Sequence, residues 1–206
     1  MDTNDDNKKE AINFLQTDFN QCFNQIRHYD SQVFDILKFS FTAYTTIIGV
    51  ALGLYQFGIK EKIDFYLPSV FILITGFIIG LYMFSVSIRN RVYFVQVTRY
   101  INEQRRTFLQ YQPLNFLNES RMYTNHLQPP YFNWRSSQSW FIYIIAFLNS
   151  LLLATLIYLI FITKSYLWLI VVLGFSLAIS IQLILGIYYL ISRENKSASK
   201  AVFGRD

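Results

Sequence analysis

Arg121 and His126 are the residues of this chain whose types and spacing could do chemistry, with four residues between them. A histidine can give or take a proton near neutral pH, and an arginine can stabilise the negative charge of a phosphorane. The spacing occurs once, in a loop-rich stretch, and such spacings are common. We therefore interpret the two residues as an ordinary interfacial pair and assign no catalytic residue.

No other catalytic or cofactor-binding motif is visible in the sequence. The chain lacks a Walker-type loop, a Gly-x-Ser-x-Gly elbow, a His-Glu-x-x-His helix and a dinucleotide fingerprint. Its single cysteine, Cys22, and its two histidines cannot build a zinc cage or an internal disulfide. We expect no enzymatic activity, no metal and no cofactor.

The chain as a whole is apolar. Of 206 residues, 53% are hydrophobic and 15% are charged, against about 45–50% and 25% in soluble domains. Four runs without a charged residue or a histidine are each about long enough to cross a bilayer: Phe39 to Phe57, Phe65 to Ile88, Trp140 to Ile162 and Tyr166 to Ile191. Only residues 58–64 and 163–165 join the members of each pair. The sequence predicts an all-α membrane protein with four transmembrane helices in two hairpins.

The basic residues predict the orientation of these spans. Fifteen Lys and Arg residues fall on the side of both termini and the central segment, and three, Lys60, Lys62 and Lys164, fall on the other. Cytoplasmic flanks of membrane proteins are enriched in Lys and Arg. Both termini are therefore expected in the cytoplasm, with the two short loops outside.

Five segments follow from this topology. Residues 1–38 form a cytoplasmic amphipathic helix, 39–88 and 140–191 the transmembrane hairpins, 89–139 a basic cytoplasmic helix and connector, and 192–206 a cytoplasmic tail. Helical periodicity continues after the second span as far as Phe108, so this helix extends into the cytoplasm. Residues 1–38 carry a net charge of −3 and 89–139 carry +5. We expect the two helices to pack through apolar faces, with Glu10, Asp18 and Asp30 available to the arginines.

The basic helix carries five arginines that could contact a partner or phosphates: Arg89, Arg91, Arg99, Arg105 and Arg106. They are equally explained as ordinary flanking charge. Anionic lipid head groups present phosphates to such a segment, and so does nucleic acid. Aromatic residues at helical spacing more often belong to a core than to a base-stacking surface, so nucleic acid is the minor interpretation.

Small and polar residues mark faces within the spans. Thr42, Thr45, Thr46 and Asn149 are the residues expected to line a pore. The pairs Gly49 with Gly53 and Gly76 with Gly80 permit close helix packing, within one monomer or between copies. No span carries a carboxylate, lysine or histidine for proton or cation coupling, which disfavours a pump. A homo-oligomer in the bilayer is expected.

Two stretches of the chain are distinctive: the helix ending Asn24 to Phe34 (NQIRHYDSQVF) and the extended helix Arg89 to Arg106 (RNRVYFVQVTRYINEQRR). Together with a close pair of spans, they resemble small membrane effectors of bacterial antiviral systems. The similarity is to the SLATT class, to retron-linked membrane proteins and to multi-span accessory proteins of type VI CRISPR systems. SLATT proteins usually have two spans, so the second hairpin here favours the CRISPR accessory comparison. The Arg121 and His126 spacing is also that of HEPN ribonucleases, in which paired motifs cut RNA across a dimer.

This resemblance implies a protein of the bacterial cytoplasmic membrane that modulates antiphage defence, by forming a pore or depolarising the membrane. The alternative is a noncatalytic adaptor that recruits or regulates a cytoplasmic partner such as an RNA-guided nuclease. Its partners would then be the lipid bilayer, further copies of the chain and a protein of the defence system.

Overall fold

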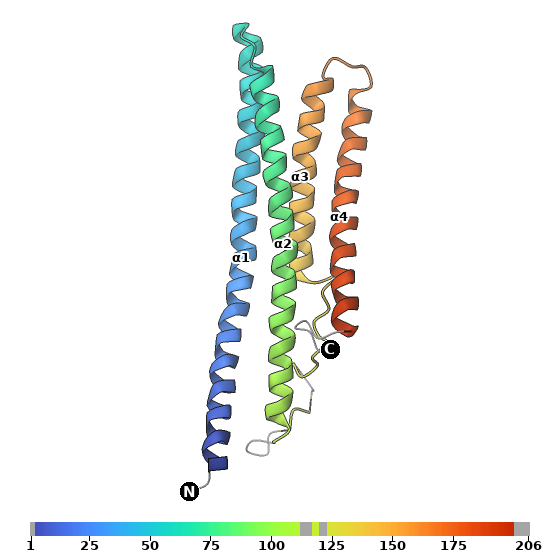
Figure 1. Ribbon diagram of the computed structural model, residues 1–206. Coiled ribbons are helices and arrows are strands. Elements are labelled where there is room, and N and C mark those ends of the chain that lie inside the picture. Colours follow the sequence, from blue (N-terminus) through green and yellow to red (C-terminus); the bar gives the residue numbers. More distant parts are fainter. Residues whose placement is uncertain (1–2, 112–116, 120–122, 200–206) are drawn as a thin grey trace. The chain divides into compact units, whose positions relative to one another are not determined.

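The protein is all-helical in the part described by its structure, a computed structural model that describes residues 3–111, 117–119 and 123–199. Four helices follow one another with no β-strand among these residues: α1 (Thr3–Glu61), α2 (Tyr66–Leu109), α3 (Ser137–Phe161) and α4 (Leu167–Ser199) (Figure 1). All four are long and apolar enough to cross a membrane. The predicted all-α class and the four helices long and apolar enough to span a membrane are thus confirmed.

The chain divides into two compact units. Among the described residues, those within 1–32, 90–131 and 192–206 form unit 1, and residues 33–89 and 132–191 form unit 2. Helices α1, α2 and α4 each contribute to both units. The polar segments of the sequence fall in unit 1, and the four apolar runs fall in unit 2.

A tight turn joins α1 to α2. The backbone N–H of Ile63 donates to the Gly58 carbonyl at 3.0 Å, and Lys62 adopts a φ of 56°. A Cβ on Gly58 would lie 2.6 Å from the Ile63 carbonyl oxygen, so only glycine fits there. Asp64 accepts the Tyr66 N–H at 3.0 Å and so caps the start of α2.

Short-range hydrogen bonds also form the start of α3 and the turn between α3 and α4. Ser136 caps α3 by accepting the Ser139 N–H, at 3.1 Å. Lys164 and Leu167 continue the turn between α3 and α4, with N–H donors to the carbonyls of Phe161 and Lys164 at 2.9 and 3.1 Å. Short links of this kind place consecutive helices beside one another within unit 2.

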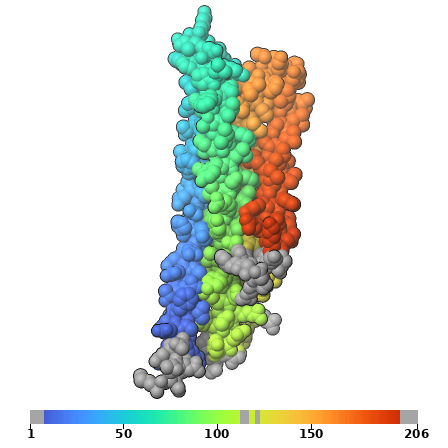
Figure 2. All heavy atoms as spheres, viewed as in Figure 1, coloured from blue at the N-terminus to red at the C-terminus, as the bar shows by residue number. Residues whose placement is uncertain are grey.

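The core of unit 2 is built from α1, α2 and α3. Seven buried residues form it: Tyr44, Ala51, Leu73, Leu148, Leu152, Leu156 and Leu159. Helix α4 has few buried residues, and Figure 2 shows it at the surface beside α2. The side chains of Phe84 and Ile88 of α2 lie close to where a Cβ on Gly186 of α4 would be. Most of α4 therefore exposes leucine, isoleucine and valine, as a helix facing lipid does.

Candidate functional site

Arg121, one member of the predicted Arg121 and His126 pair, lies outside the described residues. His126 is exposed in a turn. Among the residues that the structure covers, no group of three His, Cys, Asp or Glu side chains could hold a metal ion. The candidate sites are therefore the buried polar side chains of the two units and one exposed face of α1.

A polar layer crosses the interior of unit 2, centred on Asn149, which is fully buried. Asn149 Nδ2 donates to Gln182 Oε1 at 2.8 Å. Gln182 Nε2 donates in turn to Ser150 Oγ and to the Ala178 carbonyl, both at 3.1 Å. These bonds tie α4 to α3, because a buried amide in an apolar medium is costly unless its hydrogen bonds are made.

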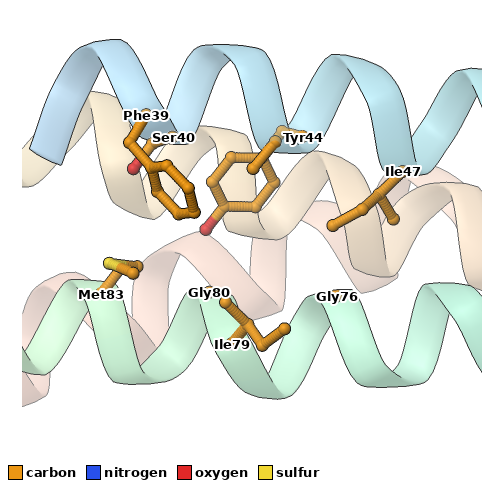
Figure 3. Close-up of a pocket in the computed structure, with 9 residues that line it drawn as sticks. Phe39, Ser40, Tyr44, Ile47, Gly76, Ile79, Gly80 and Met83 are labelled. Carbon is orange, nitrogen blue, oxygen red and sulfur yellow. The ribbon is translucent and has the colours of Figure 1, made fainter.

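Gly80 of α2 and Tyr44 of α1 also belong to this layer. A Cβ on Gly80 would collide with Asn149 Oδ1 and with the Tyr44 hydroxyl, so these two oxygens converge on the glycine from α3 and α1. Figure 3 shows the Tyr44 side chain reaching across from α1 with its hydroxyl directed at Gly80. Both oxygens are buried and have no hydrogen-bond partner among the described residues. All four helices thus contribute to the layer.

Beside this layer, α1 and α2 enclose only a small crevice (Figure 3). Its volume is about 10 Å³, which is close to the minimum that a single water molecule needs. Its lining is apolar apart from Ser40 and Tyr44, and runs along Phe39, Ser40, Ala43, Tyr44, Ile47, Gly76, Ile79, Gly80 and Met83. The crevice is too small for a substrate molecule.

The predicted pore-lining residues are not brought together within one chain. Asn149 is buried in the polar layer, whereas Thr42, Thr45 and Thr46 are exposed on α1. Thr42 and Thr45 donate to carbonyls of their own helix, those of Lys38 and Phe41, at 3.1 and 2.8 Å. Their hydroxyls are therefore satisfied without another helix of the same chain.

The four predicted packing glycines also separate into two kinds. Gly76 and Gly80 pack inside unit 2, and a Cβ on Gly76 would lie 2.8 Å from Ile47. Around Gly49 and Gly53 a Cβ would meet nothing within 4 Å. The exposed residues on this side of the helix form what we name the α1 outer stripe: Thr42, Thr45, Thr46, Gly49, Gly53 and Gln56.

The five arginines of the basic helix differ in their surroundings. Arg91 is buried in unit 1 and donates to the carbonyls of Tyr131 and Pro130 at 3.0 and 2.7 Å. Burial, with a contribution from the neighbouring Arg99, lowers the pKa of Arg91 to about 10. This side chain holds the connector against α2.

Arg99 forms an ion pair with Glu194, in which its Nη2 donates to both carboxylate oxygens at 2.7 and 2.9 Å. Its Nε donates to the Pro129 carbonyl at 3.0 Å, and its guanidinium lies 4.7 Å from the centre of the Tyr131 ring. Glu194 also accepts the Tyr131 N–H at 2.8 Å. Arg99 and Glu194 therefore join α2, the connector and the end of α4.

The remaining three arginines are more accessible. Arg105 is half-buried and lies over the rings of Phe19, Phe23 and Tyr123, 5.1–5.6 Å from their centres. Arg89 and Arg106 are exposed. Of the predicted contact group, Arg91 and Arg99 are thus committed to the interior of unit 1, and only the exposed members could reach an external phosphate.

The first part of α1 contacts α2 in unit 1, but with other polar partners than expected. Asp18 accepts from the Tyr100 hydroxyl and from Gln104 Nε2, at 2.7 and 2.6 Å. The rings of Tyr29 and Tyr93 stack with centres 6.1 Å apart. Asp30 lies near enough to Arg91 to raise its pKa, against the lowering by burial. The sequence predicts arginines as the partners of Asp18, whereas the structure pairs it with Tyr100 and Gln104.

Comparison with known proteins adds no relative. No protein-family model, curated protein or solved structure matches the chain. Inferences about function therefore depend on the residues and geometry described above.

Proposed function

We propose that this chain is a multi-pass protein of the bacterial cytoplasmic membrane that self-associates and permeabilises or depolarises the membrane in antiphage defence. In this proposal, α1 with α2 and α3 with α4 form two transmembrane hairpins through their apolar runs. The distribution of Lys and Arg, fifteen to three, supports a cytoplasmic location for both termini. The part of α1 before residue 39 is then a cytoplasmic amphipathic helix.

The observation that carries the proposal is the exposure of the α1 outer stripe. Three threonines, two glycines and a glutamine lie on one face of an apolar helix, and no other helix of unit 2 covers Gly49 or Gly53. Lipid supplies little hydrophobic driving force for helices to associate. The contact face is therefore determined by small residues, which allow the backbones to approach closely, and by polar side chains, which form hydrogen bonds between helices. A second copy of α1 satisfies both requirements.

Assembly of several copies with these stripes directed inward would create a polar path through the membrane. The crevice described between α1 and α2 holds only about 10 Å³, so the proposal puts the path between copies of the chain. Thr42, Thr45, Thr46 and Gln56 would line it. The resemblance to defence-associated membrane proteins supplies the biological setting and leaves the chain noncatalytic.

Reconstitution into dye-loaded liposomes tests permeabilisation. We expect leakage to rise with protein density and to fall severalfold in the variant Thr42→Val/Thr45→Val/Thr46→Val. The control is Thr155→Val on α3, where the threonine likewise donates to a carbonyl of its own helix, at 2.9 Å. Absence of leakage and of ion current at every density, including in cells under phage challenge, would overturn the proposal.

The noncatalytic adaptor is the second candidate, because the polar segments form a packed unit of their own. Bonds from Arg91, Arg99 and Asn102 to connector carbonyls give unit 1 a fixed surface for a cytoplasmic protein. Nucleic acid is less well matched, since Arg91 and Arg99 are buried. Recovery of one dominant soluble partner without any change in membrane potential would select the adaptor.

A further inference from the structure

One end of unit 2 brings together residues from all four of its helices. Tyr44, Gly80, Asn149 and Gln182 mark the level of the polar layer. Beyond it, Phe34 of α1 contacts Phe141 of α3 with ring centres 5.1 Å apart. On α4, a Cβ at Gly186 would lie 3.1 Å from Ile88 of α2. Since residues 34, 88, 141 and 186 lie in the same direction from the layer, they define one end, which we name the collar.

The collar presents two exposed tryptophans on a well-fixed backbone. Trp134 is 64% exposed and Trp140 is 59% exposed. Trp134 packs edge to face with Phe132 at 4.8 Å, and Trp140 packs similarly with Tyr143 at 5.8 Å. Asn133 accepts from the Ser136 N–H and the Ser139 hydroxyl, at 3.1 and 2.6 Å, which fixes the loop that carries Trp134.

Basic side chains accompany these rings. Lys38, Arg89 and Arg135 are exposed at this end, and Asp35 is an exposed acid there. The positive excess suits an anionic surface. An indole has an apolar body and a polar N–H, so it is favoured where hydrocarbon gives way to head groups.

We propose that the collar binds anionic glycerophospholipids, with Trp134 and Trp140 at the level of the ester carbonyls and Arg135 and Lys38 at the phosphates. Lipid is favoured over a protein partner because Trp140 directly begins the apolar run of α3, so the bilayer is the adjacent medium. The inference rests on the proposed insertion of the helices but not on permeabilisation. It goes beyond the proposed function by assigning a lipid class and the residues that contact it.

Fluorescence quenching tests the position of Trp134. The full-length variant Trp140→Phe/Trp168→Phe leaves Trp134 as the single tryptophan. In vesicles of phosphatidylcholine and phosphatidylglycerol, we expect lipids brominated near the glycerol end of their chains to quench it severalfold more than aqueous iodide. Quenching mainly by iodide would overturn the proposal, and so would protection from both quenchers, which marks a protein interface.

A second measurement tests lipid class. Spin-labelled phosphatidylglycerol should associate with the wild-type protein severalfold more strongly than spin-labelled phosphatidylcholine, and Lys38→Gln/Arg135→Gln should remove most of this preference. The variant Lys60→Gln/Arg106→Gln removes the same charges from exposed positions outside the collar and should keep it. An unchanged preference in the collar variant overturns the proposal. Failure of dye leakage alone leaves both measurements unaffected, so the two proposals fail separately.

Discussion

At the scale of single residues, Gly80 and Gly49 illustrate two different roles of glycine in this protein: packing within the chain and access for another helix. The space beside Gly80 is filled by Tyr44 and Asn149, and the space beside Gly49 is open. Gly80→Ala should destabilise the folded protein in detergent by about 1–3 kcal/mol, because a methyl group overpacks the layer. Thermal unfolding measures the change.

The matched variant Gly49→Ala should leave the monomer unchanged or stabilise it by up to about 1 kcal/mol, since alanine favours a helix over glycine. It should nevertheless weaken self-association, because the glycine face permits close approach. Equal melting temperatures for the two variants would contradict the assignment of Gly80 to the polar layer.

The ion pair of Arg99 with Glu194 gives a second prediction at this scale. Glu194→Ala leaves the largely buried Arg99 and the Tyr131 N–H without this partner. Glu194 is itself about one-third exposed, so solvent screens this ion pair. We therefore expect its loss to lower the free energy of unfolding by about 1–3 kcal/mol, less than the loss of a fully buried pair. Hydrogen exchange at the Tyr131 amide should speed up severalfold. Glu103→Ala, at an exposed acid on α2, should leave that exchange rate unchanged.

Cys22 reports on the packing of unit 1. Its side chain is buried, and burial, with a smaller effect from Asp18, raises the pKa of the thiol. Because the thiolate is the reactive form, alkylation in the folded protein should be slow near neutral pH. Tyr100→Phe/Gln104→Leu removes both donors to Asp18 and should speed maleimide labelling severalfold. Rapid labelling of the unaltered protein would contradict a packed unit 1.

At the scale of elements, α4 is the helix most dependent on a few polar contacts. It contributes few buried residues, and Gln182 supplies three of the hydrogen bonds of the polar layer. Interhelical hydrogen bonds in membranes contribute about 0.6–2 kcal/mol each. The position of α4 beside α3 therefore depends on side chains near its middle as well as on its short link.

Gln182→Leu should consequently loosen α4 from α3 by about 1–2 kcal/mol, because Asn149 then lacks its acceptor. A cysteine pair placed across α3 and α4 measures this loosening as slower disulfide formation. Gln56→Leu, on the α1 outer stripe, should leave that rate unchanged, and an equal effect of both variants would argue against the layer.

At the scale of the whole molecule, uninterrupted apolar runs predict four long helices. Helical periodicity predicts that the second helix continues to Phe108, and α2 ends at Leu109. Periodicity reveals which residues share a face, but not which face meets which neighbour. The pairing of Arg99 with Glu194, 95 residues apart, and the convergence of Tyr44 and Asn149 on Gly80 depend on tertiary packing. Equal glycine spacing likewise could not distinguish the packed pair in α2 from the open pair in α1.

The orientation of the chain in the membrane gives the last prediction. In a Cys22→Ser background, Lys62→Cys lies in the turn between α1 and α2, and Arg106→Cys lies in the last turn of α2. The excess of Lys and Arg around the termini and the central segment predicts position 106 inside the cell and position 62 outside. A membrane-impermeant maleimide should label Lys62→Cys in intact cells and Arg106→Cys only after permeabilisation. Labelling of both positions from the same side would contradict an odd number of crossings between them, and the proposed path along the α1 outer stripe would then lose its basis.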